Sequence, residues 1–131
     1  MMKPLPFSGL KLDIVKGGET DEYPQPGNIC TVHYTAYLMM DDDGMPHDET
    51  KEKTPGPVFD STYARGKPFK FKLGAEQVIE GLDKAVAQLS LGERAKISIG
   101  SELAYGKQGF PFLVPPGCAL VYDLQLLEFE T

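Results

Sequence analysis

VIEGLDKAVAQL, residues 78–89, is the one segment of this chain with a clear helical period. Its apolar side chains recur at the three-and-four spacing of a single helical face, at Leu82, Ala85, Val86 and Leu89. Gly92 follows as a stop signal. On both sides the sequence changes to a period of two, which is typical of half-buried strands. A short helix covered by a sheet buries both apolar faces, so we expect an α+β fold.

Five segments show the apolar–polar alternation of strands with one buried face: residues 10–14, 28–38, 69–73, 95–99 and 120–127. The second is the clearest, because Cys30, Val32 and Tyr34 share one face while Thr31 and His33 lie on the other. Five strands and a single helix favour an antiparallel sheet.

The length and composition predict one soluble, monomeric domain. The chain has 131 residues, of which 41% are hydrophobic and 24% charged, and no apolar run approaches the 18 residues or more of a membrane span. Pro4 and Pro6 predict a flexible lead-in over residues 1–9, followed by the domain at 10–131. No secretory signal is visible, so we expect a cytoplasmic protein, with the nucleus as the alternative.

The charge and the cysteines exclude some functions. A net charge of −6 disfavours nucleic acid as a partner, because binding to phosphates needs a basic surface. Cys30 and Cys118 could form one disulfide, but a cytoplasmic domain with this much apolar sequence does not need it. We expect two buried thiols.

An acidic, proline-rich insertion occupies about residues 39–57. It holds six acidic residues against two lysines, and its prolines exclude a helix. A calcium loop beginning at Met39 would place Met39 and Thr50 at ligand positions that need carboxylates, so we expect no metal there. A segment this long is either disordered or a docking feature, and its composition favours disorder.

The usual catalytic motifs are missing, and aromatic residues stand out instead. His33 and His47 lack a third ligand at zinc spacing, and there is no glycine-rich phosphate loop. We therefore expect no metal and no cofactor. Tyr105 and Phe110 lie in a turn-forming stretch, AYGKQGFP, where large exposed aromatic residues favour a ligand site over a core role.

Several motifs, in this order along the chain, resemble those of FKBP-type peptidyl-prolyl isomerases. They are VHYT at 32–35, VFDST at 58–62, KPF at 67–69, VIEGL at 78–82, ERAK at 93–96, AYG at 104–106 and VPP at 114–116. Together they extend over nearly the whole chain. The resemblance implies a twisted five-stranded antiparallel sheet wrapped around one short helix, with an apolar pocket between them. It also implies isomerisation of X-Pro bonds in proline-containing peptides and unfolded proteins, and binding of macrolides such as tacrolimus and rapamycin.

The same resemblance implies the residues of the site. The catalytic set would be Tyr34, Phe59, Asp60, Tyr105 and Tyr122. The ligand-binding set would be Arg65, Phe69, Val78, Ile79, Leu82, Phe110, Leu113 and Val114. Well-known members carry tryptophan at the pocket floor where this chain has Leu82, and they lack the long insertion.

Two functional hypotheses remain, with a third less favoured. The complete aromatic wall favours an enzyme, whereas the smaller floor at Leu82 favours a non-catalytic module that holds a protein partner. A purely structural β domain would leave Tyr105, Phe110 and the Pro115-Pro116 turn without an explanation.

Overall fold

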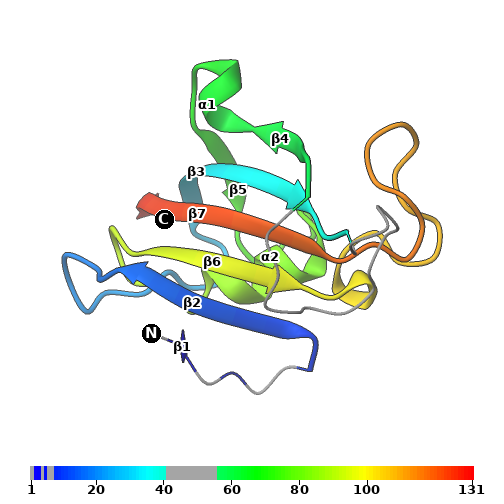
Figure 1. Ribbon diagram of the computed structural model, residues 1–131. Helices are drawn as coiled ribbons and strands as arrows, with labels where there is room; N and C mark the ends of the chain where they lie inside the picture. Colours follow the sequence, from blue (N-terminus) through cyan, green and yellow to red (C-terminus); the bar gives the residue numbers. More distant parts are fainter. Residues whose placement is uncertain (1, 4, 6–7, 41–55) are drawn as a thin grey trace.

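The computed structural model describes the chain except for residues 1, 4, 6–7 and 41–55 (Figure 1). Most of the predicted acidic insertion therefore lies outside the described residues. Its two flanks are anchored, because the Leu38 amide donates to the Pro57 carbonyl at 2.9 Å and the Gly56 amide donates to the Leu38 carbonyl at 2.7 Å.

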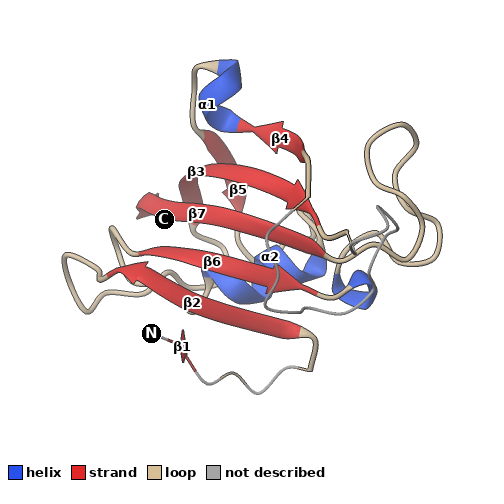
Figure 2. Cartoon of the chain, viewed as in Figure 1, coloured by secondary structure: helices blue, strands red, loops and turns tan. Residues whose placement is uncertain are grey.

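Strands dominate the described part of the chain, with short helical segments between them (Figure 2). In order, the elements are β1 (Met2–Lys3), β2 (Leu10–Lys16), β3 (Ile29–Leu38), β4 (Val58–Ser61), α1 (Thr62–Arg65), β5 (Phe69–Lys72), α2 (Glu80–Val86), β6 (Arg94–Ile99), the 3-10 turn η1 (Ser101–Leu103) and β7 (Leu120–Glu130).

The strands form one antiparallel sheet in the order β1-β2-β6-β7-β3-β4, and β5 also pairs with β3. β4 and β5 share one edge of β3: β5 pairs with its first part, Ile29 to Val32, and β4 with its later part, Thr35 to Tyr37. The predicted α+β fold is confirmed. Among the described residues the sheet has seven strands rather than five, because β1 has only two residues and the β4 sequence, VFDS, does not alternate between apolar and polar residues.

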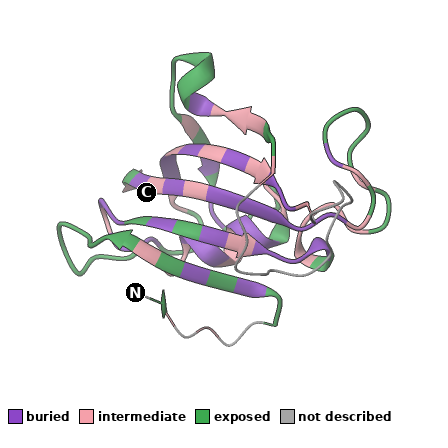
Figure 3. Cartoon of the chain, viewed as in Figure 1, coloured by how far each residue is buried: buried purple, intermediate pink, exposed green. Residues whose placement is uncertain are grey.

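The core lies between α2 and one face of the sheet (Figure 1). The helical face predicted from the sequence is buried, and the strands alternate between buried and more exposed residues (Figure 3). Helix α2 ends at Val86, whereas the predicted apolar face continues to Leu89. The helix ends early because the Gln88 and Leu89 amides donate to carbonyls three residues back and not four, at 2.9 and 3.1 Å. Gly81 has a steric role, since a Cβ there would overlap the Ile99 side chain of β6.

The N-terminal strand is attached to the domain by a lysine. Met2 and Lys3 pair with β2, and the Lys3 ammonium donates to the buried Glu93 carboxylate and to the Gln88 carbonyl, both at 2.7 Å. Part of the predicted lead-in is therefore held against the end of α2.

Both cysteines are buried and free, as the sequence predicted. Burial raises the pKa of Cys30 to about 11, with a smaller contribution from the nearby Asp83 carboxylate. Burial also raises the pKa of Cys118. Both thiols are therefore protonated and unreactive at neutral pH.

Two leucines of β7 provide a test of this core. Leu124 is 1% exposed and Leu127 is 38% exposed, so the same substitution can be compared at a buried and at an exposed position of one strand. We expect Leu124→Ala to lower the free energy of unfolding by about 2–5 kcal/mol, and Leu127→Ala to lower it by roughly 0.5 kcal/mol or less. Urea denaturation measures both values, and equal losses would contradict the described core.

Candidate active site

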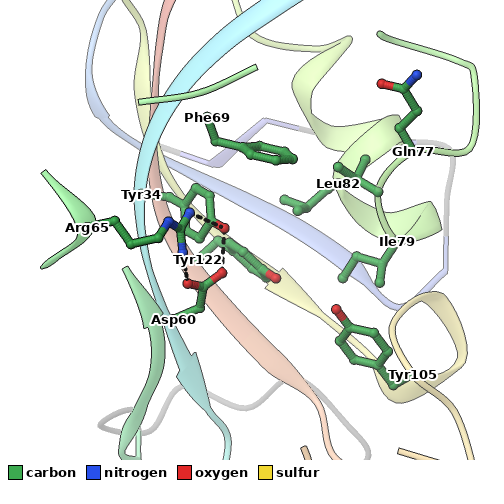
Figure 4. Close-up of a pocket in the computed structure, with 10 residues that line it drawn as sticks. Tyr34, Asp60, Arg65, Phe69, Gln77, Ile79, Leu82, Tyr105 and Tyr122 are labelled. Carbon is green, nitrogen blue, oxygen red and sulfur yellow. Dashed lines mark hydrogen bonds and ion pairs between the residues drawn. The ribbon is translucent and has the colours of Figure 1, made fainter. Parts of the chain in front are cut away.

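A cavity of about 410 Å³ opens between the start of α2 and the sheet (Figure 4). Four strands, both helices and two loops contribute its walls. The lining residues are Tyr34 of β3, Asp60 of β4, Arg65 of α1, Phe69 of β5, Tyr122 of β7, Leu82 of α2, Gln77, Val78 and Ile79 before α2, and Tyr105 after η1.

Aromatic rings form the sheet side of the cavity. Tyr34 lies between Tyr122, at 5.2 Å between ring centroids, and Phe69, at 6.3 Å and nearly perpendicular. Phe59 meets Tyr122 edge-on at 6.2 Å but does not line the cavity itself. These contacts fix the rings against one another, so the wall keeps its shape without a ligand.

A network of three polar side chains closes one side of the cavity (Figure 4). The Tyr34 hydroxyl donates to Asp60 Oδ2 at 2.5 Å, and Arg65 forms an ion pair with Asp60 Oδ1. Arg65 Nη2 also donates to the Tyr34 hydroxyl at 3.4 Å, and the guanidinium lies 5.9 Å from the centre of the Tyr34 ring. Both Asp60 oxygens thus have partners inside the protein.

Local sequence signals explain how Arg65 reaches this network. The Ser61 hydroxyl caps α1 by accepting the Ala64 amide at 3.3 Å. Gly66 ends the helix in the left-handed region at φ 76°, which glycine adopts without strain. One turn of helix therefore separates Asp60 from Arg65 and returns the arginine toward the carboxylate.

The cavity holds neutral phenols at physiological pH. The pKa of Tyr34 is raised to about 12, first by burial and then by its hydrogen bond to Asp60, against the lowering effect of Arg65. Burial likewise raises the pKa of Tyr122 and of Tyr105. The Tyr105 hydroxyl points into the cavity and, in the described part of the chain, has no hydrogen-bond partner.

The floor of the cavity is the first turn of α2. Ile79 is the N-cap residue, and its carbonyl accepts the amides of Leu82 and Asp83 at 3.0 and 3.2 Å. Leu82 is 7% exposed and belongs to both the cavity and the core. The helix that fills the core therefore also carries the floor.

The loop residues predicted for the site lie apart from this cavity. Phe110 and Val114 pair across a tight turn, with amide-to-carbonyl distances of 2.8 and 2.9 Å. Together with Leu113 they line a second hollow, of about 430 Å³, beside Leu38 and the Pro115-Pro116 turn. Phe110 still reaches the first cavity indirectly, because its ring contacts that of Tyr105 at 5.4 Å.

Sequence reasoning missed Gln77, which lines the cavity. Its side-chain oxygen accepts the Lys72 amide at 2.8 Å and so ties the loop before α2 to the end of β5. Its position beside Val78 was the only signal in the sequence.

The described residues also bear on metal binding and on membrane insertion. No group of three or more His, Cys, Asp or Glu side chains there could hold a metal ion. No helix in that part of the chain is long and apolar enough to cross a membrane.

Comparison with known proteins agrees with this architecture of a sheet and one core helix. A family model described as FKBP-type peptidyl-prolyl cis-trans isomerase matches residues 20–127. FK506-binding protein 1 of Kluyveromyces lactis is 40% identical over 113 residues, which are 86% of each chain. The solved N-terminal domain of FKBP42 from Arabidopsis thaliana has a TM-score of 0.80 and 27% identity, and the match covers all of this chain and 93% of that one.

The chain belongs to the FKBP-type peptidyl-prolyl cis-trans isomerase family. The family resemblance found in the sequence is thereby confirmed, and the class of activity is peptidyl-prolyl cis-trans isomerisation.

The raised pKa of Tyr34 predicts a loss of stability in alkaline solution. The folded protein holds this proton up to a pKa of about 12, against an ordinary value of 10.0, so the stabilisation is complete below pH 10 and is lost as the pH rises toward 12. We expect the melting temperature to fall across this range, and to fall less in Tyr34→Phe. Tyr63→Phe, which removes an exposed phenol, is the control and should follow the unmodified protein.

Proposed function

We propose that the cavity between β3, β7 and the start of α2 is where this enzyme isomerises X-Pro bonds. The observation that carries the proposal is a cavity with an aromatic wall, into which the neutral Tyr105 phenol points without a hydrogen-bond partner among the described residues. The substrates would be proline-containing peptides and unfolded proteins, so the enzyme would assist protein folding. The cytoplasmic location stays a prediction from the sequence.

The chemistry requires no nucleophile, because no covalent bond breaks. Rotation about a peptide bond meets a barrier of about 18–20 kcal/mol, since twisting destroys the amide resonance. Unaided X-Pro bonds take roughly tens to hundreds of seconds to interconvert. The twisted form has a less polar carbonyl and a more pyramidal nitrogen than the planar form. A site that excludes water therefore favours the twisted form.

The size of the required effect is modest. Lowering the barrier by about 7 kcal/mol would accelerate rotation roughly 10⁵-fold. Desolvation of the imide supplies part of this, and tighter binding of the distorted prolyl geometry than of the planar one supplies the rest. Both effects depend on rings held in fixed positions, which is what the contacts among Tyr34, Phe69 and Tyr122 provide.

The residues that line the cavity would have different roles in catalysis. The Tyr105 hydroxyl and the Ile79 amide would donate hydrogen bonds to substrate carbonyls, while Tyr34 and Tyr122 would surround the twisted carbonyl. Asp60 would act only on its neighbours, because its oxygens already bind Tyr34 and Arg65. Its role is to keep the wall in place.

Macrolides of the tacrolimus and rapamycin type would bind in the same cavity. Leu82 offers a smaller surface than the tryptophan of well-known family members, so we expect weaker packing against the prolyl-like ring of the drug. A cavity of this volume with an aromatic wall nevertheless fits such a ligand.

Relaxation of a Leu-Pro test peptide from cis to trans, followed with and without rapamycin, tests the proposal. We expect the protein to accelerate relaxation and rapamycin to abolish the acceleration, because drug and substrate would share one cavity. Tight drug binding without acceleration would favour a non-catalytic binding module. Acceleration that rapamycin leaves unchanged while it binds would locate catalysis outside this cavity.

Tyr105→Phe isolates one hydrogen bond of the proposed site. We expect it to weaken rapamycin binding by about 0.5–1.5 kcal/mol, the worth of a neutral hydrogen bond. Isothermal titration calorimetry measures the loss, with Tyr63→Phe as the matched control on an exposed tyrosine. An unchanged affinity in Tyr105→Phe would remove this hydroxyl from the site.

A further inference from the structure

One hydroxyl group fills a gap in the strand pairing beside the cavity. β5 pairs with β3 as far as Val32, and β4 pairs with it from Thr35 onward, which leaves Tyr34 between the two partners. Thr62, at the start of α1, is fully buried at this point. Its Oγ1 accepts the Tyr34 amide at 2.8 Å and donates to the Tyr34 carbonyl at 3.1 Å. The Thr62 side chain thus makes the hydrogen bonds to the Tyr34 backbone that a neighbouring strand would make elsewhere in the sheet.

The bonding at this hydroxyl is coupled to the tautomer of a neighbouring histidine. The hydroxyl has one proton, which can go to the Tyr34 carbonyl at 3.1 Å or to His33 Nδ1 at 2.7 Å. With the proton toward the carbonyl, which attaches both backbone groups of Tyr34, His33 Nδ1 is a donor. Tyr63 stacks on the His33 ring at 4.4 Å with 10° between the planes, which holds the ring in this orientation.

Thr62 lies between Asp60 and Arg65 in the sequence, and both of these contact the Tyr34 side chain. We propose that Thr62 is a positioning residue of the isomerase: its hydroxyl fixes the backbone of Tyr34 to the junction of β4 and α1. The Tyr34 hydroxyl, Asp60 and Arg65 then meet in one arrangement at the polar side of the cavity. Thr62 does not line the cavity, so it acts through Tyr34. This inference rests on the proposed function of the cavity.

Substitutions at residue 62 separate the effect of the hydroxyl from the effect of side-chain volume. Thr62→Val has nearly the same volume but leaves the Tyr34 amide and carbonyl without this partner, whereas Thr62→Ser keeps the hydroxyl. We expect Thr62→Val to lower kcat/KM on a Leu-Pro peptide roughly tenfold, and Thr62→Ser to stay within about twofold. Thermal melting of each variant confirms that it is folded at the assay temperature.

A double-mutant cycle with Tyr34→Phe distinguishes positioning from general stability. If Thr62 acts through the Tyr34 hydroxyl, Thr62→Val should cost less than about twofold once that hydroxyl is absent. The same tenfold loss in both backgrounds would contradict the inference, and so would a folded Thr62→Val with full activity. A fully active Tyr34→Phe would also contradict the inference, because the Tyr34 hydroxyl would then have no role for Thr62 to act through. If the unmodified protein were inactive, the proposed function would fail instead.

A measurement on the unmodified protein keeps the inference testable if Thr62→Val does not fold. Nitrogen-15 NMR of the histidine ring reports which nitrogen carries the proton in the neutral state. We expect the proton of His33 on Nδ1. A proton on Nε2 alone would mean that the Thr62 hydroxyl donates to His33 and not to the Tyr34 carbonyl, and the proposed attachment would be wrong.

Discussion

The packing of α2 against the inner face of the sheet is the interaction on which the rest of the structure depends. This short helix buries one face in the core, and its first turn also forms the floor of the cavity. Leu82 belongs to both regions, so the surface that stabilises the fold is continuous with the wall of the cavity. A change in how the helix sits on the sheet would therefore alter the cavity.

The polar side of the cavity is built for rigidity rather than for proton transfer. The Asp60 oxygens are held by Tyr34 and Arg65, and the buried phenols keep their protons well above neutral pH. Such a site offers fixed dipoles and ring edges but no free base. That agrees with a reaction that rotates a bond without breaking one, and it explains why sequence motifs for nucleophiles and metals gave no signal.

The predictability of each element followed its apolar period. β3 and β7 alternate over most of their length, the four residues of β5 alternate as well, and the helical face of α2 repeats over two turns. β4 has two apolar residues followed by two polar ones, and α1 is a single turn, so neither shows a period. Yet these two elements carry Asp60 and Arg65, so the part of the site hardest to predict from periodicity is its polar side.

The sequence by itself determined the fold class, the family and most of the side chains now seen around the cavity, because periodicity and family motifs are local properties of the chain. Only the tertiary structure decided which side chains meet. It separated Phe110, Leu113 and Val114 into a second hollow, added Gln77 to the first, and brought the Thr62 hydroxyl to the backbone of Tyr34. Such contacts join residues far apart in the chain, and the packing of whole elements sets their distances, which no short stretch of sequence encodes.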